Sequence, residues 1–219
     1  GLEIGGMRLD RLGYEGTAGA AGGAPRASVR RKVIWFAVDS FDWTIARPLI
    51  AAGRMPHLKR LVDEGAWGNL RTIRPILSPV VWTSAATGKL PAKHGIFYFL
   101  ATDPKTGALV PVTSTLRKTR AFWNILSDGG VSVGVVAWWA SFPAETVDGF
   151  IVSDRISHHI FKSQVKEESS NDLLRTYPPD LYRQIAPLIK APTAVTTEEL
   201  SRFINLGRYA SRFSPDDKE

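Results

Sequence analysis

The sequence predicts an α/β protein in which helices cover both faces of a mostly parallel sheet. Short apolar runs typical of buried strands alternate with amphipathic runs of helical length. A strand followed by a helix and another strand is typical of parallel strands joined by crossovers. Of the 219 residues, 44% are apolar and 10% are aromatic, which is enough to build a hydrophobic core.

The first predicted element is a buried strand over residues 33–38, which is apolar throughout and has charged or polar flanks. Asp39 follows directly at its carboxyl end. Residues 1–30 are rich in Gly and Ala and hold few bulky apolar side chains. Because such a segment cannot offset the entropy cost of ordering, we expect a flexible leader there.

Two helices are expected next, over residues 43–52 and 55–64. Gly53 and Gly65 follow these two patterns directly, and glycine commonly ends a helix. Residues 67–73 are then expected to form a second strand.

A third helix is predicted over residues 78–87, with a signal at each end. Ser78 would be the capping residue, Pro79 the first helical residue, and Gly88 the residue just past the end. We therefore expect the Ser78 side chain at the amino end of a helix.

Three further elements complete a predicted core over residues 31–155. A helix over 119–127 leads into buried strands over 131–138 and 150–153. Residues 156–219 are richer in charged and polar residues, so we expect a helical cap or insertion there. Its two predicted helices cover residues 179–189 and 197–206.

The two ends of the chain lead us to expect a fragment of a longer protein. The sequence begins without Met and stops in a charged stretch that has no closing strand or helix. We therefore expect the core to be incomplete and the cap to be truncated.

Composition excludes several kinds of site. The chain has no cysteine, which rules out disulfides, thiolate metal sites and cysteine nucleophiles. The net charge of +7 suits an anionic substrate, but the basic residues are scattered and form no nucleic-acid reader motif. No apolar run approaches the roughly 20 residues of a membrane span, and no signal-peptide core is present, so we expect a soluble chain. Compartment and oligomeric state are not predicted.

Asp39 and Ser78 are the candidate functional residues. Ligands of open α/β sheets bind beyond the carboxyl ends of strands, where Asp39 is expected, and a carboxylate there suits a divalent cation. The alternative for Asp39 is a helix cap, a role for which Asp42 competes. The Ser78 hydroxyl would lie at the positive end of a helix dipole, which favours a phosphate oxygen or an alkoxide. The alternative for Ser78 is an ordinary cap.

The four histidines are weaker candidates. None belongs to an Asp-His pair or to a helical His-x-x-x-His spacing, so each is expected to be structural or solvated. His94 follows the predicted Ser78 helix through a turn and could orient the site loop or donate a hydrogen bond behind it. The other three are His57, His158 and His159.

A series of short motifs occurs in order between residues 32 and 99 and again further on. The motifs are Val38-Asp39, Gly53-Arg54-Met55-Pro56-His57-Leu58-Lys59-Arg60-Leu61, Glu64-Gly65-Ala66, Pro75-Ile76-Leu77-Ser78-Pro79, Thr87-Gly88, Pro91-Ala92-Lys93-His94-Gly95-Ile96, Trp138-Trp139-Ala140-Ser141-Phe142-Pro143-Ala144-Glu145, Gly149 and Val152-Ser153-Asp154-Arg155. The chain thereby resembles the type I phosphodiesterase and nucleotide pyrophosphatase branch of the alkaline phosphatase superfamily. The later motifs resemble a bacterial subgroup of that branch.

This resemblance implies an alkaline phosphatase-like fold and a metal-dependent hydrolase of phosphoric esters. It implies that Asp39 is a metal ligand and that Ser78 is both the nucleophile and a ligand of the same metal. Family members use two zinc-like ions and form a covalent phospho-enzyme that water hydrolyses. The implied substrate is a small phosphate ester whose identity the sequence does not specify.

The chain departs from the family pattern at three places. It contains no Asp-His pair, although such a pair supplies further metal ligands in the family. The aromatic residues 97–99 occupy the region where many nucleotide pyrophosphatases have an Asn, and the residues after Ser78 do not fit the sulfatase motif. We therefore expect an N-terminal part of a phosphodiesterase-like hydrolase, with little or no activity alone. The alternative is a non-catalytic binding module that keeps the fold.

Overall fold

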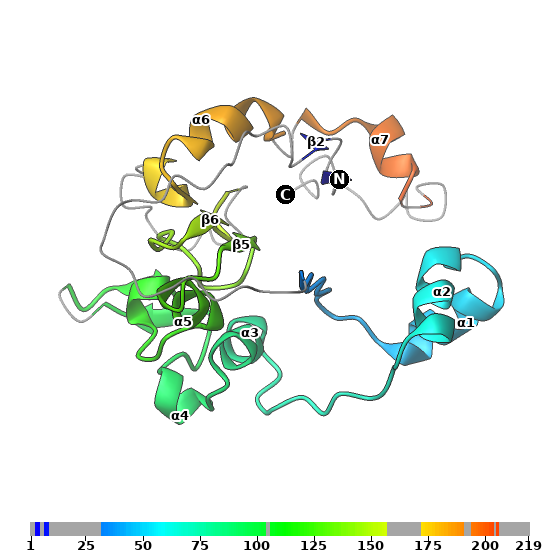
Figure 1. The fold of residues 1–219 in the computed structure, drawn as a ribbon, viewed down its shortest axis with the longest axis horizontal. Coiled ribbons are helices and arrows are strands. Elements are labelled where there is room, and N and C mark those ends of the chain that lie inside the picture. The colour runs from blue at the N-terminus through cyan, green and yellow to red at the C-terminus, as the bar shows by residue number, and fades with distance from the viewer. Residues whose placement is uncertain are drawn as a thin grey trace.

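The computed structural model of the protein shows a mixed α/β fold made of helices and small sheets (Figure 1). It describes residues 3–4, 7–8, 32–103, 106–156, 172–190, 194–203 and 205. The expected leader over 1–30 lies outside these ranges except for a two-residue pair of strands, β1 (Glu3–Ile4) and β2 (Met7–Arg8). The α/β class is confirmed, and the mostly parallel sheet is not.

The central sheet has the order β5-β6-β7 and is of mixed direction. Strand β5 (Val133–Val136) pairs in parallel with β6 (Gly149–Val152), which pairs antiparallel with β7 (Thr176–Tyr177). Gly149 has φ +129°, and a Cβ at that position would lie 1.9 Å from the carbonyl oxygen of Val133. Only glycine therefore permits the close parallel contact at the start of these strands.

A separate hairpin consists of β3 (Leu100–Thr102) and β4 (Leu109–Pro111). The sequence patterns did not predict this hairpin or β7. Residues 176–177 belong to the region expected to be only a helical cap, yet they add a strand to the central sheet.

The strand expected over residues 33–38 is wrong as a description of this structure. The segment is extended without ladder hydrogen bonds, and its apolar side chains face solvent, with Val33 at 89% and Phe36 at 86% exposure. The strand expected over 67–73 is absent as well. A buried strand requires a hydrogen-bonded neighbour, and β5 pairs on one edge only among the described residues.

Two helices form a lobe of their own. In Figure 1, α1 (Trp43–Ala51) and α2 (Pro56–Glu64) lie beside each other and away from β5 and β6. Asp42 caps α1 by accepting the Thr44 backbone N–H at 2.7 Å. Residues 65–77 then lead back toward the sheet as an extended connection.

Three helices and a 3-10 turn lie around a core next to the central sheet. They are α3 (Ser78–Thr87), α4 (Pro91–His94), the 3-10 turn η2 (Ser114–Leu116) and α5 (Phe122–Asp128). Trp123 and Ile151 are fully buried there. Trp138 contacts the rings of four other aromatic residues, namely Trp35, Trp82, Phe122 and Trp123.

The C-terminal described region consists of short helical turns around α6 (Leu181–Ile185), whose Leu181 and Ile185 are buried. The helices expected over 179–189 and 197–206 are both shorter than predicted. The other turns are η3 (Asp172–Arg175), η4 (Ala186–Leu188) and α7 (Thr197–Ser201). None of the helices in the described ranges has the length and apolarity that crossing a membrane requires.

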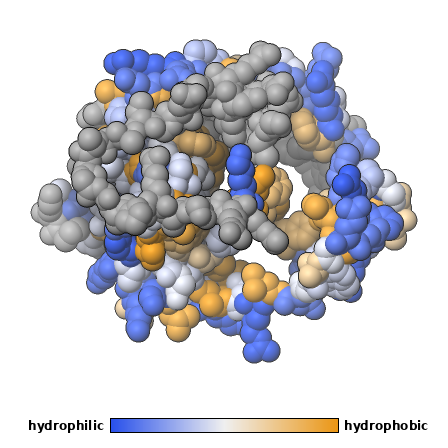
Figure 2. Space-filling model, viewed as in Figure 1, coloured by the Kyte–Doolittle hydropathy of each residue, from blue (hydrophilic) through white to orange (hydrophobic). Residues whose placement is uncertain are grey.

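Figure 2 shows hydrophobic residues among hydrophilic ones on the face viewed. Several large apolar side chains are exposed, including Ile34, Leu61, Leu70 and Phe97. The described part of the chain thus buries only a portion of the apolar surface that its composition supplies.

Candidate functional site

Asp39 lies in an exposed turn between the extended segment 33–38 and α1. Its neighbour Ser40 has φ +57°, a left-handed conformation that turns the chain sharply after Asp39. Because Asp42 caps α1, Asp39 is not needed as a cap. The structure therefore removes the capping alternative for Asp39 and leaves its carboxylate facing solvent.

Ser78 is the first residue of α3 and is half-buried. The sequence predicted Ser78 as the cap, whereas the capping position is taken by Leu77, whose carbonyl accepts the N–H groups of Val80 and Val81. No described residue hydrogen-bonds to the Ser78 hydroxyl. The hydroxyl thus lies at the amino end of a ten-residue helix without a structural partner.

The structure describes both Asp39 and Ser78 but shows no direct interaction between them. Neither a hydrogen bond nor an ion pair joins these two residues, and the α1–α2 lobe separates them in the chain. In the ranges that the structure describes, no group of three or more His, Asp or Glu side chains could hold a metal ion. A carboxylate and a hydroxyl suit a divalent cation, but two donors do not complete a tetrahedral zinc site.

His94 connects α4 to α3 and is fully buried. Its Nε2 atom lies 2.9 Å from the Ser84 hydroxyl, and its Nδ1 atom accepts the backbone N–H of Ile96 at 3.1 Å. Because Nδ1 accepts a hydrogen bond, the single ring proton is on Nε2 and is donated to Ser84. Burial lowers the pKa of His94, so the ring is neutral near pH 7.

Gly95 allows a neighbouring segment to approach His94 closely. It has φ +80°, and a Cβ at this position would lie 2.9 Å from the Lys118 side chain. The backbone N–H of Lys118 donates to the His94 carbonyl at 2.9 Å. Ile96, which follows, is buried in a small cluster with Val112. Each residue of the His-Gly-Ile motif therefore has a separate packing role.

Asp154 holds the loop that follows β5. Its carboxylate accepts the N–H groups of Ala140 at 2.8 Å and Phe142 at 3.0 Å, and also the Ser141 hydroxyl. Burial raises the pKa of Asp154, although these backbone bonds and the charge of Arg155 act in the opposite direction. Ala140 has φ +58°, so the carboxylate stabilises a strained turn.

The loop after β5 also contacts the middle of α3. Trp138 donates its Nε1–H to the backbone carbonyl of Trp82 in the middle of α3 at 3.0 Å. Gly88, in the left-handed conformation, ends the helix by donating its N–H to the Ser84 carbonyl. Together with the bond to His94, these contacts hold the helix that begins at Ser78.

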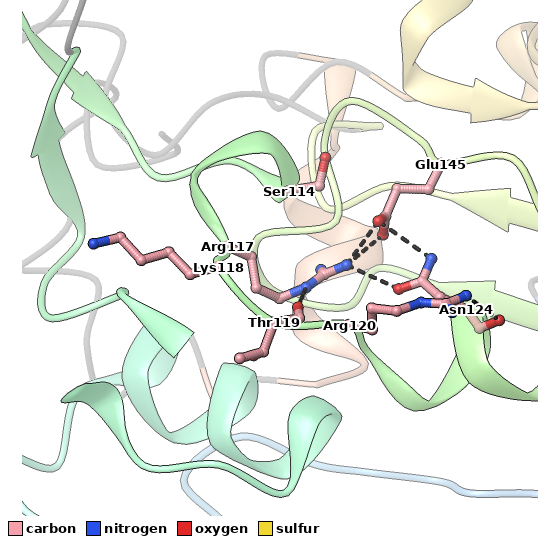
Figure 3. A pocket seen from close by; sticks show the side chains of 7 residues that line it. All are labelled: Ser114, Arg117, Lys118, Thr119, Arg120, Asn124 and Glu145. Carbon is pink, nitrogen blue, oxygen red and sulfur yellow. Dashed lines mark hydrogen bonds and ion pairs between the residues drawn. The ribbon is translucent and has the colours of Figure 1, made fainter. Parts of the chain in front are cut away.

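A polar pocket of about 280 Å³ lies beside α5 and is lined by Ser114, Arg117, Lys118, Thr119, Arg120, Asn124 and Glu145 (Figure 3). At its centre, Glu145 accepts the Arg117 guanidinium at 2.7 Å and the Trp123 Nε1–H at 2.9 Å. Figure 3 shows Lys118 extending away from this contact, so the cations of the pocket do not converge on one point. These contacts stabilise the fold around α5. The sequence patterns did not predict them, because Arg117 and Glu145 are 28 residues apart.

The other three histidines do not take part in this arrangement among the described residues. His158 and His159 lie outside the described residues, and His57 is exposed in the first turn of α2. Asp154 and Glu145 were not predicted as functionally placed residues, although both belong to the later motifs.

A model of the family described as type I phosphodiesterase / nucleotide pyrophosphatase matches residues 33–212. This range includes both Asp39 and Ser78. Neither the comparison with curated proteins nor that with solved structures gave a match.

Proposed function

Because the chain belongs to the type I phosphodiesterase / nucleotide pyrophosphatase family, we propose that it supplies the nucleophile and one metal ligand of a phosphoric ester hydrolase. The substrate class is a small phosphate ester, whose anionic phosphoryl group suits a chain with a net charge of +7. The alternative is a non-catalytic module that binds an anionic ligand through the same helix end.

The observation that carries this proposal is the position of Ser78. Its hydroxyl lies at the amino end of α3, is half-buried, and is not used for capping. The helix dipole and the first N–H groups favour negative charge at this position, either on the serine oxygen or on a phosphoryl oxygen. A serine in this setting can attack phosphorus once its proton is removed.

The proposed cofactor is a pair of zinc ions, with Asp39 and Ser78 among the ligands. Such ions lower the pKa of a coordinated hydroxyl and neutralise charge on the phosphoryl group. The sequence has no Asp-His pair, the motif that supplies further metal ligands in the family, so we propose that these ligands are not part of this sequence. For that reason the chain alone is proposed to have little or no turnover.

We further propose that the complete core is alkaline phosphatase-like, with residues 33–38 as an additional parallel strand beside β5. Two observations support this arrangement. The segment is apolar and exposed, and its Trp35 already contacts Phe122 and Trp138 next to β5. Pairing there would place Asp39 at the carboxyl end of the sheet, where ligands of such sheets bind.

The test uses the protein encoded by the complete reading frame, supplied with Zn²⁺ and assayed on bis-p-nitrophenyl phosphate and p-nitrophenyl phosphate. We expect metal-dependent release from the diester and a phospho-enzyme that intact-protein mass spectrometry detects after acid quenching. Ser78→Ala should abolish the phospho-enzyme, whereas the control Ser201→Ala on exposed α7 should keep it. Wild-type turnover by Ser78→Ala would exclude Ser78 as the nucleophile.

Asp39→Asn tests the metal assignment separately. Replacing the charged carboxylate should reduce bound zinc, as measured by inductively coupled plasma mass spectrometry of the dialysed protein. Unchanged zinc content would show that Asp39 is not a ligand. A complete protein that binds no metal and hydrolyses neither ester would favour the binding module.

A further inference from the structure

We propose that His94 is a positioning residue that fixes α3, and with it Ser78, through a single neutral tautomer. The inference rests on the proposed function for the role of Ser78. The tautomer of His94 and the contact between α3 and α4 are inferred independently of the proposed function. The residue would act on Ser78 through Ser84 and would not contact substrate.

The hydrogen bond from Ile96 identifies which nitrogen of His94 is the donor to Ser84. The backbone N–H of Ile96 cannot accept a hydrogen bond, so Nδ1 of His94, 3.1 Å away, must be the acceptor. Nε2 then carries the proton and donates to the Ser84 hydroxyl. A Ser-His contact would ordinarily suggest a general base, but this ring has no free nitrogen to accept a proton from Ser84.

Ser84 belongs to the same helix as Ser78. Ser84 lies six residues after Ser78, which corresponds to about 9 Å along a helix axis. Because α3 is one uninterrupted helix, a bond that fixes Ser84 also fixes the direction in which Ser78 points. Val80 and Thr83 are buried between them, so this part of the helix has little room to rotate.

His94 is itself held from two sides. Its carbonyl accepts the Lys118 N–H, and Gly95 gives the Lys118 segment the space to approach. Lys118 follows Arg117, whose guanidinium is paired with Glu145. His94 is thus held by the segment that contains Arg117 and Lys118, and its ring in turn holds Ser84 of α3.

Two substitutions of His94 separate the hydrogen bonds made by its two ring nitrogens. His94→Asn is expected to keep an acceptor near the Nδ1 position but not to reach Ser84. His94→Gln is expected to reach Ser84 with its amide N–H. Thr87→Ala is the matched control, because Thr87 lies in the same helix but its hydroxyl bonds only to the Thr83 carbonyl and the Lys89 N–H. Thr87→Ala thus removes a hydroxyl from α3 without removing its contact with α4.

The first measurement is the tautomer of His94 by long-range proton–nitrogen NMR at neutral pH, with His94→Asn to assign the signal among four histidines. We expect a protonated Nε2 and an unprotonated Nδ1. A proton on Nδ1, or a doubly protonated ring, would overturn the inference whether or not the protein is an enzyme.

The second measurement is turnover of the diester by the complete protein. Ser84→Ala and His94→Asn should lower kcat by about tenfold or more with little change in KM, because a small displacement of a reacting group is costly. Thr87→Ala should keep kcat, and His94→Gln should recover part of it. Equal kcat in Ser84→Ala and Thr87→Ala would overturn the positioning role.

A wild-type protein without turnover would count against the proposed function, and the contact would then be decided by urea unfolding. We expect Ser84→Ala to cost much less in a His94→Asn background than in the wild type. If the two costs simply add, Ser84 and His94 are not coupled and the inference fails on its own account.

Discussion

Replacing Glu145 with Ala should destabilise the folded protein by about 3 kcal/mol. The Glu145 carboxylate accepts the Arg117 guanidinium at both oxygens, at 2.7 and 2.8 Å, and also the side-chain N–H groups of Trp123 and Asn124. The Arg117 side chain is only 3% exposed. Without Glu145, the acceptors left to the Arg117 guanidinium among the described residues would be the neutral Asn124 Oδ1 and Thr119 carbonyl oxygen.

The magnitude follows from burial on each side of the pair. Breaking a buried ion pair costs roughly 3–5 kcal/mol, because one charge remains without its partner. The Glu145 side chain is 26% exposed, so water can enter the space it leaves, and we expect the lower end of that range. A loss of about 3 kcal/mol corresponds to a decrease in Tm of roughly 6–12 °C for a chain of this size.

The assay is urea unfolding at neutral pH followed by tryptophan fluorescence. Glu64→Ala is the control, because its partner Arg60 is exposed and an exposed helical pair contributes about 0.5 kcal/mol or less. The double variant Arg117→Met with Glu145→Met should recover much of the stability, since it removes both charges. A Glu145→Ala loss within about 1 kcal/mol of the Glu64→Ala loss would refute this reasoning.

Two further predictions concern the His-Gly-Ile motif. Gly95→Ala should cost more stability than Gly88→Ala: both glycines have positive φ, worth about 1 kcal/mol, but only at Gly95 would the new methyl meet Lys118. Equal urea midpoints for the two variants would show that the Lys118 segment moves freely. Burial lowers the pKa of His94 from its ordinary value of 6.5. The unfolded state therefore binds more protons than the folded state once the pH falls below about 6.5. The contribution of His94 to stability should be complete above about pH 6.5 and should be lost as the pH drops through the lowered pKa. The difference between wild type and His94→Asn in unfolding free energy should show this slope, and a pH-independent difference would contradict it.

The first three predicted helices agree with α1, α2 and α3 because the signals at their ends are local. Pro79 and Gly88 mark the two ends of α3 within one or two residues, and Gly53 and Gly65 follow α1 and α2 closely. The cap of α3 was predicted at Ser78 but is Leu77, one residue earlier, which has no capping side chain and accepts the first helical N–H groups with its backbone carbonyl.

Strand pairing could not be predicted, because a strand depends on neighbours that lie far away in the sequence. The apolar pattern of 33–38 is that of a buried strand, but the structure gives it no ladder partner. Conversely, Thr176 and Tyr177 pair with β6 although two residues carry no periodic pattern. The same limit applies to the site: the motifs predict Asp39 and Ser78 as a pair, but their relative position depends on how the segment before Asp39 pairs, which no local pattern determines.

The aromatic cluster around Trp138 and two further aromatic contacts give the molecule three sets of chromophores. Four of its seven tryptophans belong to the cluster around Trp138, Trp43 and Trp67 contact each other beside α1, and Trp139 contacts Phe99. Rings held in fixed asymmetric contact give near-ultraviolet circular dichroism, which disappears when packing loosens. Single Trp→Phe variants would assign each band to its set. Loosening of the α1–α2 lobe and loosening of the sheet region could then be followed separately in one unlabelled sample.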